Sequence, residues 1–271
     1  KDFTERTRFI HSLRLEHLAY DYDNHHLVGN TRDDGSNCGF GGCLYTRPAS
    51  RDDSFTNVGV RFGFETDFGD DVLYGAISTG FRPPQASELY RLRGGQVVAD
   101  LDSEELSSVE VGYKTPLLQV AMFYEQTRNL ILRDADAFNI SNGKTDTFGF
   151  EIEGSIEFGT HKLSAATTFA RHQYAFGRLA TGRETIEDGN EIDTAPRWLG
   201  NIRWRTDVSE SLSSEFELSM IGEHYVNAAN TAEYDGHHVL HWRGQYQVSD
   251  NLVTYVRLVN VLDERYADRA D

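Results

Sequence analysis

The 271-residue sequence contains no run of about 18 apolar residues, the length that a helix needs to cross a bilayer, and its mean hydropathy is negative. A helical membrane span is therefore excluded. A transmembrane β-barrel is not, because its strands alternate apolar and polar residues and stay polar on average. Proline is also scarce, and all five prolines fall where loops, corners or strand starts are expected, as a hydrogen-bonded ladder requires.

Basic residues are in deficit, with 26 Lys and Arg against 43 Asp and Glu, which gives a net charge of -17. This balance argues against nucleic acid as a partner, because a phosphate backbone attracts clustered cations. Many acids lie in the polar stretches 99–105, 134–136 and 184–193, a composition expected of solvated loops.

Cysteine is nearly absent, and the two that occur, Cys38 and Cys43, lie in one glycine-rich segment. Zinc would need about four ligands, and no second pair of cysteines or nearby histidines completes a site, so no metal centre is expected. The spacing is too wide for a C-x-x-C redox motif. A structural disulfide between Cys38 and Cys43 in an oxidising compartment is the favoured interpretation, with two free thiols as the alternative.

Alternation of apolar and polar residues with period two is the clearest positive signal. In the segment 145–158, one face carries Phe148, Phe150, Ile152, Ile156 and Phe158, and the other carries Thr147, Glu151, Glu153, Ser155 and Glu157. Similar patterns predict about eleven strands, many of them long enough to cross a bilayer when tilted. The predicted strands are 7–22, 56–68, 71–81, 104–114, 118–133, 145–158, 162–174, 196–206, 211–225, 238–248 and 252–260.

The connections between these strands alternate between tight turns and long loops. The tight turns lie near residues 69–71, 115–117, 159–161, 208–210 and 249–251, and the long loops near 23–55, 82–103, 134–144, 175–195 and 226–237. Outer-membrane barrels show this asymmetry, with short periplasmic turns and long extracellular loops. A soluble β-sandwich also alternates, but it has no reason to place every long loop at one end. We therefore predict an all-β fold, an antiparallel transmembrane meander.

Aromatic residues near the expected strand ends support this prediction. They lie on the apolar face and are typical of the girdles found at the two membrane interfaces. The residues are Tyr113, Phe158, Trp198, Trp204, Trp242 and Tyr246.

Three segments resemble a known family. Phe81-Arg82-Pro83-Pro84 followed by Glu88-Leu89-Tyr90 resembles the FRxP…ELY stretch of TonB-dependent receptors, and Asn260-Val261-Leu262-Asp263 followed by Tyr266 resembles the stretch before their last barrel strand. Between them, Asn142-Gly143 followed by Gly149-Phe150-Glu151 resembles a strand entry of the same family. The prolines can end a strand, and Asn260 and Asp263 can shape the turn that leaves one.

The resemblance implies a barrel of 22 strands with a plugged lumen, of which this chain supplies about eleven. Residues 1–271 are then the C-terminal portion of the barrel, without the plug domain, the TonB box, the first barrel half or the final strand. It further implies a monomeric outer-membrane receptor, not an enzyme and without a cofactor. Its partners would be the TonB complex, reached through the absent N-terminal region, outer-membrane lipid and a small-molecule ligand.

Four residues near the expected outer rim are candidates for ligand binding: Arg82, Tyr90, Arg91 and Arg93. Guanidinium groups can grip carboxylate or catecholate-iron anions, and tyrosine can stack on them. A ferric siderophore is the favoured ligand, and solvated loop arginines are the plainer alternative.

Six histidines also fall at the expected extracellular strand ends, which keeps haem or metal capture open: His25, His26, His172, His224, His237 and His238. The interval from Leu92 to Glu105, however, lacks the histidine and the NPNL box that haem receptors of the family carry. Cobalamin or oligosaccharide receptors of the same family remain alternatives. A passive porin, a soluble β-sandwich binder and a barrel enzyme using Asp235 with His237 and His238 are further alternatives.

Overall fold

The computed structural model describes residues 2–4, 6–25, 36 and 45–267, and nearly all of the regular elements in these residues are β-strands. Cys38 and Cys43 lie outside the described residues, so their disulfide stays a prediction. Within the described ranges, no helix has the length and apolarity needed to span a membrane.

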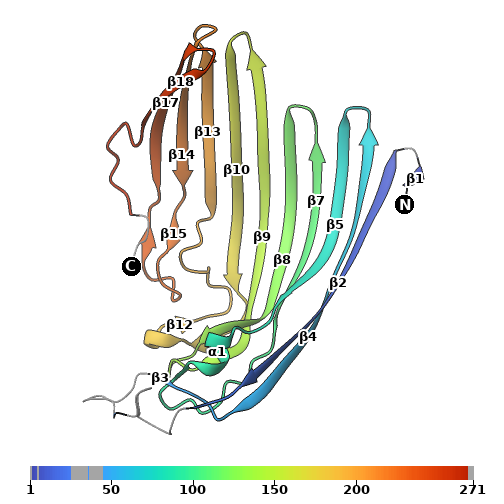
Figure 1. Cartoon of the computed structure of the whole chain (residues 1–271), viewed down its shortest axis with the longest axis vertical. Helices are drawn as coiled ribbons and strands as arrows, with labels where there is room; N and C mark the ends of the chain where they lie inside the picture. Colours follow the sequence, from blue (N-terminus) through green and yellow to red (C-terminus); the bar gives the residue numbers. More distant parts are fainter. Residues whose placement is uncertain (1, 5, 26–35, 37–44, 268–271) are drawn as a thin grey trace.

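A single antiparallel sheet of twelve strands forms the body of the molecule, and its spatial order follows the chain order. Figure 1 shows these strands as a curved wall. The strands are β1 (Asp2–Thr4), β2 (Thr7–Tyr22), β4 (Arg51–Phe68), β5 (Asp71–Arg82), β7 (Glu104–Lys114), β8 (Leu118–Arg133), β9 (Asn139–Phe158), β10 (His161–Tyr174), β13 (Trp198–Asp207), β14 (Leu212–Ile221), β17 (His237–Ser249) and β18 (Leu252–Leu258).

Small elements occupy the long connections at one end of this wall, called here the long-loop end. They include α1 (Ala86–Tyr90) and the 3-10 turn η1 (Thr181–Arg183). Three two-stranded ribbons pair β3 (Tyr45–Thr46) with β6 (Leu92–Arg93), β11 (Arg178–Leu179) with β12 (Thr185–Ile186), and β15 (His224–Tyr225) with β16 (Glu233–Tyr234). Figure 1 shows α1, β3 and β12 gathered at this end, opposite the tight turns.

The predicted meander and its strand count are confirmed, with β1 as one additional short strand. Three long strands have the predicted bounds, namely β2, β7 and β8. Strand β9 begins six residues earlier than predicted, at Asn139, because its polar start pairs with the end of β8 through two irregularities in register. The predicted strand 211–225 ends at Ile221, where the Gly222 amide donates to the Trp198 carbonyl and the chain turns away.

The register of the strands places apolar residues opposite apolar ones and polar residues opposite polar ones on neighbouring strands. One cross-strand row joins Phe62, Ile77, Val109, Tyr124 and Phe148, all apolar or aromatic. The adjacent row joins Arg61, Ser78, Ser108, Glu125 and Thr147, all polar. The sheet therefore has one continuous apolar face and one continuous polar face, because side chains point alternately to opposite sides of a strand.

The apolar face forms a band whose height suits a bilayer. On β9 it runs from Phe148 to Phe158, within the range of about 9–11 residues that a tilted strand needs to cross the hydrocarbon core. At its edge toward the long loops, the Tyr124 hydroxyl donates to Asp146 Oδ1 over 3.0 Å. At the other edge, the rings of Trp204 and Phe216 stack with centroids 6.2 Å apart. Aromatic residues thus border the band on both sides, as expected of girdles.

Aromatic rings pack closely on glycines of the polar face. A methyl group on Gly112 would lie 2.2 Å from Cζ of Tyr74, because the Tyr74 ring covers this glycine. The Tyr74 hydroxyl also accepts a hydrogen bond from Gln119 Nε2 over 3.3 Å. Gly80, another strand glycine, has space around it, with Leu106 Cβ as the nearest atom at 4.0 Å. Gly112 is therefore a position where even one methyl group forces the ring to move.

We predict that Gly112→Ala lowers the free energy of unfolding by about 1–3 kcal/mol, because the added methyl overpacks the Tyr74 contact. Gly80→Ala is the matched control and should leave stability unchanged or slightly raised, since it adds no clash and restricts the unfolded chain. Urea unfolding of the full-length protein in detergent measures both. Equal midpoints for the two variants would contradict the prediction.

Candidate ligand-binding region at the long-loop end

The predicted strand end at the two prolines is confirmed. Strand β5 stops at Arg82, Pro83 and Pro84 follow, and α1 begins at Ala86. Gln85 is the N-cap of α1, and its backbone amide donates to Glu88 Oε2 over 2.7 Å in a capping box. The chain thus leaves the wall and turns at once into a short helix, since proline cannot donate to the ladder.

Arg82 is bound to two carboxylates of its own chain. Its Nε and Nη2 donate to Glu104 Oε2 and Oε1 over 2.6 and 2.8 Å, and its Nη1 donates to Glu88 Oε2 over 3.0 Å. Glu104 Oε1 also accepts the backbone amide of Ile131 over 2.8 Å. The bidentate geometry makes this a strong, directional contact. The Arg82 guanidinium therefore joins α1 to the first residue of β7 at the base of the loop 83–103.

Tyr90 is buried, with only 8% of its surface exposed. Its hydroxyl donates to Asp53 Oδ2 over 2.8 Å, and its ring stacks on Tyr22 with centroids 4.2 Å apart and meets Tyr20 edge-on at 5.9 Å. Burial, followed by the hydrogen bond to Asp53, raises the pKa of the Tyr90 hydroxyl. Tyr90 thus anchors α1 to the polar face of β2 and β4.

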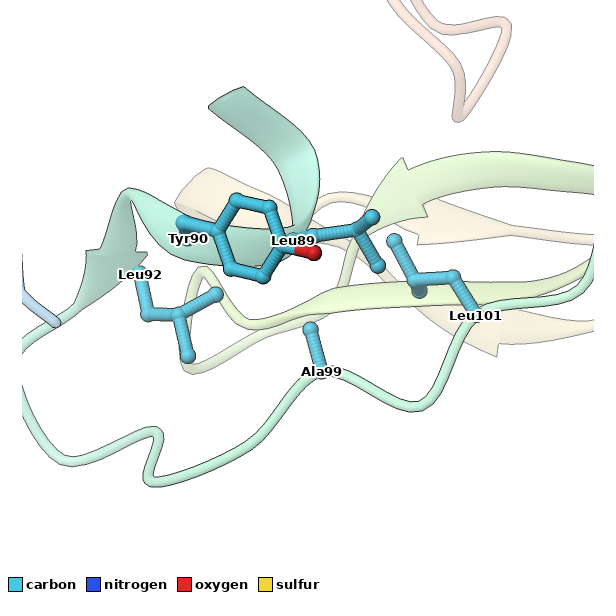
Figure 2. Close-up of a cluster of buried hydrophobic side chains, with 5 residues drawn as sticks. All are labelled: Leu89, Tyr90, Leu92, Ala99 and Leu101. Atoms are coloured by element: carbon cyan, nitrogen blue, oxygen red, sulfur yellow. The ribbon is translucent and has the colours of Figure 1, made fainter. Parts of the chain in front are cut away.

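A compact hydrophobic cluster, here the loop core, fills the space under α1. Figure 2 shows its five side chains, Leu89, Tyr90, Leu92, Ala99 and Leu101, gathered between α1 and the segment that carries the last two. They pack against Tyr20, Tyr22, Phe55 and Ile131 of the wall. Leu89 and Leu92 are 1% and 0% exposed, and burying such side chains contributes about 1.5–3 kcal/mol each.

Hydrogen bonds fix the far side of the same loop to β9. The Gln96 side chain pairs with the Asn139 backbone in both directions, at 2.9 and 3.0 Å. Asn139 Nδ2 donates to the Glu88 carbonyl over 2.8 Å, and the Asp102 amide donates to Ser141 Oγ over 2.8 Å. The early start of β9 therefore supplies the polar groups that hold the loop 83–103 in one position.

Arg91 and Arg93 lie on the exposed side of this loop, one on each side of buried Leu92. Val97 and Val98 are 77% and 43% exposed on the same loop. All four predicted ligand-binding residues thus lie in the anchored loop 83–103 or at its base. Arg82 and Tyr90 hold the loop in place, the side chains of Arg91 and Arg93 are exposed, and the role of all four in ligand binding stays a prediction.

A second anchored unit was not found by sequence reasoning. Glu191, in a stretch expected to be solvated, is only 5% exposed and accepts hydrogen bonds from Arg171 Nε at 3.1 Å and Arg197 Nε at 2.6 Å. The hydrogen bond to Glu191 is the largest cause of a raised pKa for Arg197. The amide and carbonyl of Glu191 also pair with the Asn230 side chain, at 2.7 and 2.8 Å. The loops 175–197 and 222–236 are therefore tied together.

The predicted group of histidines is brought together only in part. The Tyr234 ring lies 5.3 Å from the His224 ring, and its hydroxyl bonds His237 Nδ1 over 2.9 Å. His172 instead bonds Thr147 over 3.1 Å, and His26 lies outside the described residues. Among the residues that can be described, no cluster of three or more His, Cys, Asp or Glu side chains could hold a metal ion.

The chain turns after β18, and Asn260 stabilises this turn as expected. Its side-chain oxygen accepts the Glu264 amide over 2.8 Å, and its Nδ2 donates to the Glu264 carbonyl over 2.9 Å. Asn260 and Asp263 both have left-handed backbone angles, with φ of 55° and 53°. Asparagine and aspartate tolerate this region, which explains why they occupy the turn.

Several solved structures share this fold. The siderophore receptor PiuA from Acinetobacter baumannii aligns with a TM-score of 0.75 at 15% identity, over 98% of this chain and 38% of its own. The copper transporter OprC aligns with a TM-score of 0.75 at 18% identity, over 97% and 40%. The ferric yersiniabactin uptake receptor FyuA from Yersinia pestis aligns with a TM-score of 0.72 at 17% identity, over 97% and 39%.

The chain thus spans about two fifths of the length of these receptors. No curated protein sequence matches it. Residues 2–261 match the profile of the family described as TonB dependent receptor-like, beta-barrel. Because this match covers nearly the whole chain, the chain belongs to the family of TonB-dependent receptor β-barrels.

Proposed function

We propose that this chain is the C-terminal part of the barrel of an outer-membrane receptor that imports a large anionic metal complex, a ferric siderophore, with energy delivered by TonB. The parent protein would carry the plug domain and the contact to the TonB complex. The observation that carries the proposal is the anchored loop 83–103, which presents Arg91 and Arg93 on a fixed support at the long-loop end.

Rigid support matters for the affinity of such a site. The loop core and the Arg82 contacts hold the backbone on both sides of Leu92, so little conformational entropy remains to be lost when a ligand binds. Two guanidinium groups in a chain of net charge -17 form a local attractive patch for an anion, while the surrounding carboxylates discourage nonspecific ones. The names of the structural neighbours, receptors for siderophores and a transporter for copper, agree with uptake of a metal or its complex.

Growth assays with the full-length receptor test this proposal. Cells would receive ferric siderophores, haem, cobalamin or oligosaccharides as the sole source of the nutrient, with and without TonB. We expect growth on a ferric siderophore only when both the receptor and TonB are present. Uptake that continues without TonB would replace the proposal by a passive porin, and growth on another nutrient alone would replace the ligand.

Replacement of both exposed arginines, Arg91→Ala with Arg93→Ala, should weaken ligand binding by about 1–3 kcal/mol, because two charge-assisted contacts are lost. Arg203→Ala with Arg205→Ala removes the same number of charges near a tight turn, far along the chain from the loop, and should bind normally. Titration of the purified full-length receptor with the ligand identified by growth measures the effect. Unchanged affinity in the double variant would show that both side chains are ordinary solvated charges.

Replacement of Arg82 tests the support itself. Arg82→Ala leaves the Glu88 and Glu104 carboxylates without their cation, so the loop 83–103 should open more often and become sensitive to chymotrypsin near Tyr90. Arg82→Lys should give intermediate protection, since an ammonium group cannot bind both acids in bidentate fashion. The Arg91 and Arg93 double variant should stay protected. A loop equally resistant in all variants would refute the role of Arg82.

A further inference from the structure

Two hollows lie next to each other on the apolar face along β5 and β7, and together they are called here the groove. The first has a volume of about 300 Å³ and is bordered by Phe62, Phe64, Ile77 and Val111. The second has a volume of about 440 Å³, shares Phe62 and Ile77 with the first, and reaches Arg128. The two hollows lie on either side of Phe62 and Ile77, and the second reaches the edge of the apolar band at the long-loop end.

Residue size explains the groove. Three small residues, Gly75, Thr79 and Ser107, occupy the apolar side of β5 and β7. Larger rings stand beside them, Phe64 across from Gly75 on β4 and Tyr124 on β8. The short side chains of Thr79 and Ser107, which are paired across β5 and β7, leave the second hollow open beside the Tyr124 ring.

Two cations stand at the outer end of this groove. Arg128 on β8 lines it, and Lys144 on β9 lies directly opposite Arg128, with Cβ atoms about 5 Å apart for such a pair. Arg128 Nε donates to Gln126 Oε1 over 3.0 Å, and within the described residues neither cation forms an ion pair. The nearest acids by register are Glu105, opposite Arg128 on β7, and Asp146, whose Oδ1 accepts hydrogen bonds from Tyr124 and Gln126.

The position of Tyr124 indicates how deep Arg128 and Lys144 would lie in a bilayer. Its ring belongs to the last apolar row and its hydroxyl bonds Asp146 just beyond that row, so Tyr124 marks the edge of the hydrocarbon core. Arg128 and Lys144 lie four residues farther along β8 and β9, counted from Tyr124 and Phe148. They are therefore at the depth of lipid headgroups, where cations attract anionic lipids.

We propose that this groove is a binding site for a phosphate-bearing glycolipid of the outer leaflet, with one acyl chain between Phe62 and Tyr124 and a phosphate on Arg128 and Lys144. Snorkelling alone would place long cations at this depth, but it requires no channel beneath them. The inference rests on the proposed orientation in the outer membrane, with the long loops outside. It does not depend on which ligand is imported.

Native mass spectrometry of the full-length receptor in detergent, with added diphosphoryl lipid A, tests the site. The double variant Arg128→Ala with Lys144→Ala should retain this lipid roughly 10- to 30-fold less than the unmodified protein, because two attractive cations are removed. Ser107→Trp keeps both cations but fills the groove, and it should also reduce retention. Arg61→Ala with Lys114→Ala removes two cations from the polar face of β4 and β7 and should have no effect.

Each outcome tests one part of the proposed lipid site. Retention of lipid A by the Arg128 and Lys144 double variant at the unmodified level would overturn the phosphate contact, and full retention by Ser107→Trp would overturn the acyl groove. Phosphatidylglycerol that competes equally with lipid A would overturn the assignment to a glycolipid. TonB-dependent uptake should continue in the Arg128 and Lys144 double variant. A failure of the lipid site and a failure of the proposed transport function therefore give different results.

Discussion

Pairing of backbone hydrogen bonds between neighbouring strands is the constraint on which the rest of this structure depends. A chain that faces hydrocarbon has no water to satisfy its amides and carbonyls, so each strand must pair along its length with the next. The meander from β2 to β18 meets this requirement with tight turns on one side and long returns on the other. Once the register is fixed, every second side chain lies on the same face. The alternating sequence then produces both the apolar band and the polar face.

The long-loop end is stabilised differently from the wall, by the kinds of contact found inside a small soluble protein. Here a buried cluster, a capped helix and ion pairs hold the loop 83–103 against the wall. The FRPP…ELY motif gains a physical explanation, since its arginine binds two carboxylates and its tyrosine fills the loop core. The motif is therefore a device for fixing a loop, and the residues beside it are the ones that a ligand could reach.

The sequence was sufficient to predict the fold because period-two alternation, turn residues and loop lengths are local signals. It placed the bounds of β2, β7 and β8 correctly, but missed the early start of β9 at Asn139, since Asn, Ser and Gly resemble a turn. The site was less predictable. Tyr90 and Arg82 carry the residue types of a binding site, yet their partners Asp53 and Glu104 lie 37 and 22 residues away in the sequence. Burial of Glu191 was equally hidden, because an acidic stretch gives no local sign of a long-range contact.

The central claim is that the apolar face contacts lipid and the polar face does not, and adjacent residues of β7 offer the most direct test. Val109 and Ser108 point to opposite faces of the same strand. In full-length protein with Cys38 and Cys43 replaced by serine, a fluorescent label would be placed at Val109→Cys or Ser108→Cys, and its quenching by brominated lipids measured in bilayers. The account predicts strong quenching at position 109 and little at 108, whereas equal or reversed quenching would contradict it.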